Sequence, residues 1–191
     1  MDKHSQKNGI IVGTIWKQLL IFFFPILVGT FFQQLYNTVD AVIVGQFAGK
    51  EALSSVGGSS SQIINFVVGF FTGLSAGATV IISQFYGAND ANKIHRALHT
   101  AYAFSIVGGI IAGIIGIALT VPVMKLMNTP EELMHDSAMY VMIYFGGLVF
   151  IFVYNMGSAI LRAIGDSKRP LYYLIICCFI NIVLDIVFVS V

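Results

Sequence analysis

Five long apolar runs constrain the fold of this chain more than any other feature. They cover residues 18–44, 56–86, 97–121, 137–161 and 171–191. A helix that crosses the hydrocarbon core of a membrane needs roughly 20 apolar residues, so each run is long enough. The connections between the runs are short, and only 10% of the residues are charged. The sequence therefore predicts an all-α integral membrane protein with about five transmembrane helices.

The distribution of Lys and Arg predicts that the N-terminus is cytoplasmic. With this orientation only Lys50 and Lys125 fall on the outer side. The remaining basic residues lie in cytoplasmic segments: Lys3, Lys7, Lys17, Lys93, Arg96, Arg162, Lys168 and Arg169. Membrane proteins carry this excess of positive charge on their cytoplasmic side. We expect a cytoplasmic segment over residues 1–17 and a transmembrane domain over 18–191, in the plasma (inner) membrane.

Composition and motifs narrow the function classes. A net charge of +1 argues against a basic nucleic-acid binder. Cys177 and Cys178 are adjacent inside an apolar run, so we expect both thiols to be reduced. The sequence shows no nucleophile–base pair, no glycine-rich phosphate loop and no metal-binding spacing. We therefore expect a protein that is not an enzyme and needs no cofactor.

Polar side chains interrupt the first run at QQLYNTVDAVIVG. Gln33, Asn37 and Asp40 are spaced by four and three residues, so they share one face of a helix. Tyr36 lies one turn before Asp40. The opposite face, which includes Phe31, is apolar and can meet lipid. The polar residues therefore form a stripe along the helix.

The fifth run repeats this arrangement with Asn181 and Asp185, again four residues apart. An acid near the middle of a membrane costs roughly 2.5–3.5 kcal/mol and is functional by default. Either acid could instead lie at the outer end of its helix. We expect Asp40 and Asp185 to share one polar chamber. Reversible protonation of such a pair can exchange a proton for an organic cation.

Pro25 lies inside the first run. It removes one backbone hydrogen bond and frees the carbonyl of Ile21, which predicts a kink between Ile21 and Pro25. A static bend and a functional hinge are both compatible with this pattern.

Glycines four residues apart allow helix backbones to approach closely. This spacing occurs at Gly69, Gly73 and Gly77 and again at Gly109 and Gly113. We expect these glycines to pack helices within one bundle, with a dimer contact as the alternative.

Several segments together resemble a known family. They are Pro25 in the first run, LYNTVDAVIVG at its end, QFYGANDANKIHRAL between the second and third runs, RAIGDSKRP between the fourth and fifth, and NIVLD in the fifth. In this order they are similar to the N-terminal half of the multidrug and toxic compound extrusion (MATE) transporters. These belong to a larger superfamily that also exports lipid-linked oligosaccharides and polysaccharides.

The resemblance implies a MATE-like N-lobe helix bundle. Members have twelve spans in two lobes, so the chain would be truncated before the sixth span and the C-lobe. They export amphipathic, often cationic compounds by alternating access, driven by inward proton or sodium flow. The implied partners are small amphipathic organic cations, the lipid bilayer and the missing C-lobe.

The resemblance also implies roles for particular residues. In the proton-driven prokaryotic branch, the acid of the first span and the Asn and Asp of the fifth form a protonation site. They match Asp40, Asn181 and Asp185. Tyr36 and Asn37 lie on the corresponding stretch, and the proline at which the first helix bends matches Pro25. Many relatives place Pro after the fifth-span acid, where this chain has Ile186.

Two other functions stay open. A lipid-linked oligosaccharide flippase of the same superfamily is expected to have basic residues facing its cavity, and none lies inside the five runs. A non-transporting membrane fragment is the other open function.

In the inner loop RAIGDSKRP we expect either an ion pair between Arg162 and Asp166 or a gating contact between lobes.

Overall fold

The computed structural model describes residues 14–190, and the regular elements of this part are all helical. They are α1 (Ile15–Ile43), the π-helix η1 (Val44–Ala48), α2 (Gly49–Gly57), α3 (Ser59–Gly87), α4 (Ala91–Leu126), α5 (Glu131–Gly146), α6 (Leu148–Ala163) and α7 (Lys168–Ser190). Residues 1–13 of the predicted cytoplasmic segment, with Lys3 and Lys7, lie outside the described residues.

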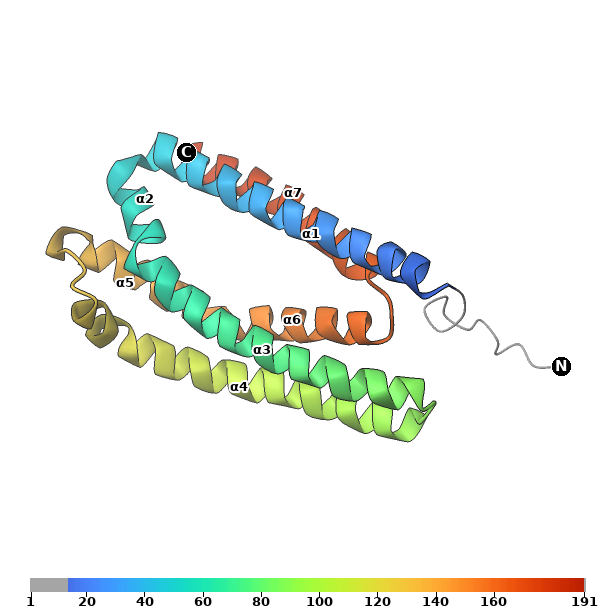
Figure 1. Cartoon of the computed structure of the whole chain (residues 1–191). Coiled ribbons are helices and arrows are strands. Elements are labelled where there is room, and N and C mark those ends of the chain that lie inside the picture. Colours follow the sequence, from blue (N-terminus) through green and yellow to red (C-terminus); the bar gives the residue numbers. More distant parts are fainter. Residues whose placement is uncertain (1–13, 191) are drawn as a thin grey trace.

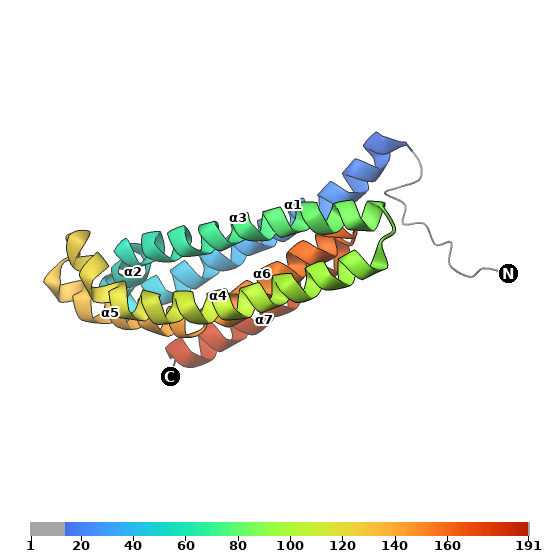
Figure 2. The ribbon, with the colours of Figure 1, turned by 90° about the horizontal axis from the view of Figure 1, so that it is seen from below.

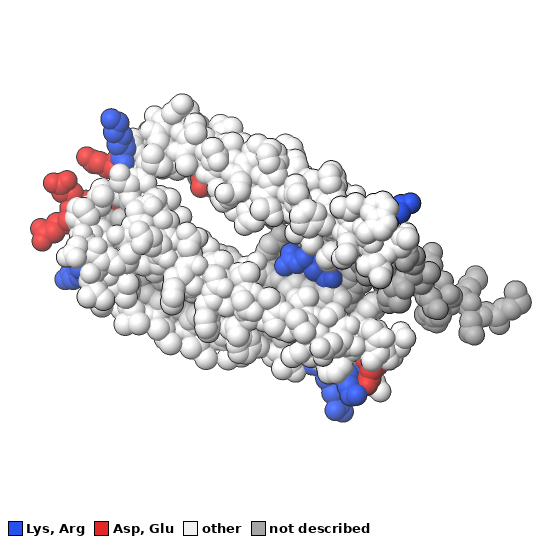
Figure 3. All heavy atoms as spheres, viewed as in Figure 1, with Lys and Arg blue, Asp and Glu red and all other residues white. Residues whose placement is uncertain are grey.

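The prediction of about five transmembrane helices is confirmed. The segments that are long and apolar enough to cross a membrane are Ile15–Phe47, Gly49–Gly87, Ala91–Leu126 and Lys168–Phe188. The bent pair α5 and α6 supplies a fifth crossing if it is counted as one span. Charged side chains gather mostly at the two ends of the molecule, with a white band between them (Figure 3).

The outer connection over 45–54, predicted as a loop, is helical instead. Lys50, Glu51, Ala52 and Leu53 are good helix formers, and they lie in α2. Gly49 takes a φ of 89°, which lets the chain turn between η1 and α2. The carbonyl of Ser55 accepts hydrogen bonds from the hydroxyls of Ser60, at 2.6 Å, and Ser137, at 3.2 Å. These bonds join α2 to α3 and to α5.

The fourth span, predicted as one helix over 137–161, is broken. α5 and α6 meet at Gly147 with a bend of 51°. Gly146 and Gly147 are consecutive, and such small residues are a common cause of helix kinks. The N–H of Gly147 still donates to the carbonyl of Ile143, at 3.2 Å, which keeps the end of α5 satisfied.

The helices form two unequal groups. Helices α3, α4, α5 and α6 pack against one another and contain two buried clusters. Their buried members are Ile64, Val141, Phe145, Leu148 and Phe152 in one cluster and Ile82, Ala101, Met156 and Ile160 in the other. Helices α1 and α7 lie side by side and run in the same direction (Figures 1 and 2). This pair joins the larger group mainly through α6, η1 and α2.

The glycine predictions are confirmed in one helix and wrong in another. A Cβ at Gly109 would lie 2.8 Å from the Cα of Val149, and one at Gly113 would lie 2.8 Å from the carbonyl oxygen of Phe145. These two glycines therefore let α4 approach the bent pair. Gly69, Gly73 and Gly77 have no atom within 4 Å of the corresponding position. They lie on an exposed face of α3, because α3 packs through its opposite side.

Both turns at the end predicted to be cytoplasmic use an aspartate to begin the next helix. Asp90 accepts the backbone N–H of Lys93 at 3.1 Å and also pairs with its ammonium at 3.0 Å. The hydrogen bond from Lys93 lowers the pKa of Asp90 below its ordinary 3.8. Asp166 accepts the backbone N–H of Arg169 at 3.1 Å and pairs with its guanidinium at 3.0 Å. The predicted pair of Arg162 with Asp166 is therefore wrong.

The close contact at Gly109 predicts an asymmetry between two glycine substitutions. Gly109→Ala places a methyl against backbone that cannot move aside, so we expect a loss of about 1–3 kcal/mol. Gly73→Ala meets nothing and should be neutral or stabilising, since Ala exceeds Gly in helix propensity by about 1 kcal/mol. Thermal unfolding in detergent measures both. Equal midpoints for the two variants would contradict the packing of α4 on α6.

The cap of α4 predicts a local pH dependence. The pKa of Asp90 is lower in the folded chain than its ordinary value of 3.8. Its ionised carboxylate therefore stabilises the fold fully above pH 3.8, and this stabilisation is lost as the pH falls through the pKa of the folded chain. We expect the Lys93 amide to lose hydrogen-exchange protection over that range. Asp90→Asn keeps a side-chain acceptor but cannot titrate, so its protection should not change with pH. The same acid transition in that variant would exclude Asp90 as its cause.

Candidate functional site

The packing of α1 on α7 places two acids at the same height. Gly29 on α1 lies 3.6 Å, measured from its Cβ position, from the side chains of Leu171 and Leu174 on α7. Leu171 and Leu174 are 142 and 145 positions after Gly29 in the sequence. Because the two helices are parallel and rise equally per residue, pairs of residues with this difference in number lie at the same height along the whole contact. Asp40 and Asp185 differ by 145, and their carboxyl groups interact. The structure therefore brings the two predicted acids together.

Two buried oxygen atoms at this contact have no hydrogen-bond partner among the described residues. They are Oδ1 of Asn181 and Oδ2 of Asp185. An unsatisfied buried polar atom is costly, and in native proteins it calls for an explanation. Both atoms are acceptors that can receive a proton donor or a cation. This arrangement gives Asp40, Asn181 and Asp185 the chemistry of a small cation site.

A group of tyrosines lies near Asp40. Tyr36 precedes Asp40 by one turn and interacts electrostatically with it and with Tyr154 of α6. Tyr140 of α5 interacts with Asp40 and Tyr36, and Tyr144 follows one turn later. Each of these four side chains presents an apolar ring and a single polar hydroxyl. Sequence reasoning identified Tyr36 and missed the others, although Tyr140 and Tyr144 have the four-residue spacing of a shared helix face.

The rest of the predicted polar stripe does not join the acids. Asn37 is exposed, and its amide donates to Oε1 of Gln34 at 3.5 Å. Gln33 lines a different hollow nearer the cytoplasmic end, with Asn155 and Arg162. A helix face rotates and rises along its length, so residues on one stripe reach different neighbours. Asn37 and Gln33 as chamber residues stay predictions.

Pro25 lies beside that same hollow, which measures about 130 Å³. Helix α1 continues through Pro25 without interruption, and the proline is buried. Figure 2 shows the blue N-terminal part of α1 inclined to the rest of the helix. The bend fits a proline inside a helix, and its use as a hinge stays a prediction.

Arg162 occupies an unexpected position. It lies in the last turn of α6, half-buried, rather than in a solvated loop. Three hollows of about 130, 430 and 390 Å³ share it as a lining residue. Basic side chains lie next to the central opening in Figure 3, away from the charged ends. No basic residue lies inside the predicted runs, but Arg162 directly follows the fourth run and lines these hollows.

Comparison with known proteins agrees with this architecture. The MatE family profile matches residues 25–187. The chain belongs to the MATE family. It is 32% identical to the "Probable multidrug resistance protein YoeA" of Bacillus subtilis over 90% of this chain and 37% of that protein. It is 33% identical to the "Probable multidrug resistance protein YpnP" of the same organism, over 94% of this chain and 40% of that protein.

Solved structures show the same fold. A crystal structure of a MATE protein in complex with MaD3S has a TM-score of 0.87 and 24% identity, and it covers 96% of this chain and 41% of that one. A MOP superfamily transporter from Pyrococcus furiosus has a TM-score of 0.88 at 24% identity, over 98% of this chain and 41% of that one.

The MATE chain described here spans about 40% of the length of its relatives. Members of the family are transporters, which supports a transport role over a catalytic one. Bacterial MATE relatives and the membrane-spanning helices together place the chain among multi-pass proteins of the plasma membrane.

The orphan oxygen of Asp185 predicts that the acid reduces stability. Asp185→Leu removes an unpaired buried polar group, so we expect a gain of about 1–3 kcal/mol. The readout is the thermal midpoint in detergent at neutral pH. Asp136→Leu, which removes an exposed acid near the start of α5, is the matched control and should give no comparable gain. A lower midpoint for Asp185→Leu would show that its carboxyl is well paired.

Proposed function

We propose that this chain is the N-lobe of a secondary antiporter that exports amphipathic, often cationic drugs and toxic compounds in exchange for protons. One observation carries the proposal: the carboxyl pair of Asp40 and Asp185 beside the unpaired buried oxygens of Asn181 and Asp185. Ionisable residues inside a membrane mark ion or substrate paths. The multidrug names of its relatives agree with this class of substrate.

The exchange follows from the charge of the pair. Two carboxyls in contact interact strongly, so they bind and release a proton as one unit. With the proton bound, the contact between α1 and α7 tightens through a carboxyl–carboxylate hydrogen bond. Without it, two negative charges repel each other and attract an organic cation. A change in this contact moves α1, and Pro25 is where α1 can bend in response.

The energy of one proton is sufficient for such export. A charge that crosses about 100 mV releases roughly 2.3 kcal/mol. Half a pH unit adds about 0.7 kcal/mol. The sum of about 3 kcal/mol supports a substrate gradient on the order of a hundredfold.

Sodium is the alternative coupling ion. Sodium prefers oxygen ligands, as other hard cations do, and Asp40, Asn181 and Asp185 offer only oxygens of this kind. The two ions separate cleanly in vesicles: a pH gradient without sodium drives a proton antiporter, whereas a sodium gradient at constant pH drives a sodium antiporter.

A lipid-linked oligosaccharide flippase is the second candidate function. The specific observation in its favour is Arg162, a half-buried cation that faces the interior. Arginine suits phosphate groups because its guanidinium donates two parallel hydrogen bonds. The acid pair counts against this candidate, because it would repel a diphosphate that passed along α1.

Substitution of the acid tests the antiporter directly. Asp185→Asn in the transporter as its gene encodes it should abolish proton-driven efflux of ethidium from cells, because the amide cannot release a proton. Expression and thermal midpoint should match the unmodified protein. Asp136→Asn, at an exposed acid of α5, should leave efflux unchanged. Normal efflux by Asp185→Asn would exclude this residue as the proton carrier, and absence of efflux in the unmodified protein would favour a non-transporting fragment.

A further inference from the structure

Arg162 has no acidic partner in the part of the chain that the structure describes. The ion pairs of residues 14–190 are Lys93 with Asp90 and Arg169 with Asp166. The three hollows that Arg162 lines contain no Asp or Glu among their lining residues. Their polar members are uncharged, for example Gln33, Asn155 and Ser83. A half-buried positive charge therefore lies in a neutral environment.

Arg162 is also the main free donor of these hollows. The hydroxyls of Thr72, Ser75, Thr79 and Ser83 already donate to backbone carbonyls of their own helix. The amide of Asn155 donates to the carbonyl of Ile151 at 3.0 Å. A guanidinium has five N–H donors and no acceptor, and no side-chain hydrogen bond of Arg162 occupies them within residues 14–190. An oxyanion satisfies this group best, through two parallel hydrogen bonds.

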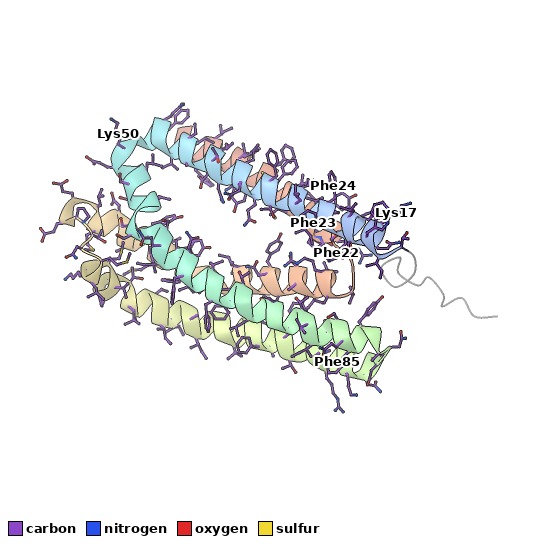
Figure 4. The ribbon with its side chains drawn as sticks, viewed as in Figure 1. Lys17, Phe22, Phe23, Phe24, Lys50 and Phe85 are labelled. Carbon is purple, nitrogen blue, oxygen red and sulfur yellow. The ribbon has the colours of Figure 1, made fainter. Side chains whose placement is uncertain are left out.

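The side chains around Arg162 favour an amphiphilic molecule as the carrier of that oxyanion. The 430 Å³ hollow continues from Arg162 along apolar side chains of α1, namely Ile15, Leu19 and Phe22. Ile15 and Leu19 are 78% and 61% exposed, which means this wall is open to an incoming chain. Phe22 lines the hollow, while Phe23 and Phe24 are largely exposed (Figure 4).

The position along the molecule fits the inner leaflet. Lys17 marks the same end of α1, opposite the end marked by Lys50 (Figure 4). Lys168 and Arg169 begin α7, six and seven residues after Arg162, and both are exposed. This is the end that the distribution of Lys and Arg assigns to the cytoplasm, where anionic lipids are attracted to basic residues.

We propose that Arg162 binds the phosphate of an anionic inner-leaflet phospholipid, whose acyl chain lies along Ile15, Leu19 and Phe22 of α1. The lipid supplies the counter-charge that the described residues lack. It also covers the side of the hollow that α1 leaves open. This site is at the opposite end of α1 from the acid pair, and it does not depend on the coupling ion or on transport.

Native mass spectrometry of the full chain in detergent tests the site. The probes are phosphatidylglycerol and a diacylglycerol with the same acyl chains, titrated separately. We expect Arg162→Gln to weaken phosphatidylglycerol binding about tenfold, as the loss of a charge-assisted hydrogen bond predicts, and to leave diacylglycerol binding unchanged. Arg162→Lys should fall between, because it keeps the charge and loses the planar fork.

Lys168→Gln is the matched control, since it removes an exposed charge from the same end without touching the hollows. It should bind phosphatidylglycerol like the unmodified chain. An equal loss in this variant, or normal binding by Arg162→Gln, would overturn the proposal. Circular dichroism reports whether Arg162→Gln folds. If it does not fold, the unmodified chain decides: equal retention of the two lipids overturns the proposal, and preference for phosphatidylglycerol supports it.

A competition with inorganic phosphate identifies the source of the anion. Phosphatidylglycerol should remain bound at millimolar phosphate, because its acyl chain contributes to affinity. Complete displacement by inorganic phosphate would indicate a site for the free anion and would exclude the lipid.

Discussion

The parallel contact between α1 and α7 is the interaction on which the candidate site depends. Gly29 marks this contact, because its Cβ position lies 3.6 Å from the side chains of Leu171 and Leu174. The register of this contact sets Asp40 beside Asp185 about three helical turns further along. A shift of one residue along either helix would rotate one carboxyl by about 100° and separate the pair.

The two groups of helices differ in how firmly they are held. Helices α3 to α6 contain both buried clusters, and Gly109 and Gly113 let their backbones meet. The α1 and α7 pair has few buried residues and joins this group mainly near its ends. Regions with few buried contacts open at low free-energy cost. The fold therefore joins a well-packed group of helices to a pair with few buried residues, and this pair carries the acids.

Charge is arranged unequally along the interior of the molecule. The acids lie toward the C-terminal ends of α1 and α7, and the guanidinium of Arg162 lies at the opposite end of the molecule, in the last turn of α6. Tyr36 and Tyr154 lie between them and interact with each other. Tyr36 also interacts with Asp40, and Tyr154 also interacts with Arg162. The two ends of this interior therefore carry opposite charges.

The sequence by itself determined the membrane class, the number of spans and the identity of the two acids. Long apolar runs have one stable solution in a bilayer, because each backbone polar group must be satisfied within its own helix. An acidic residue inside such a run departs from its apolar composition, and so the sequence alone identifies Asp40 and Asp185.

Only the tertiary structure decided which side chains meet. The break at Gly147, the partners of Gly109 and the exposed stripe of Gly69, Gly73 and Gly77 depend on which face of each helix finds a neighbour. Arg162 reads as a loop residue in sequence, and its place in the last turn of α6 turns it inward. The periodicity of a sequence shows which residues share one face of a helix. It does not show toward which neighbour that face points, or how far the helix is shifted along that neighbour. The packing between helices decides both the direction and the shift.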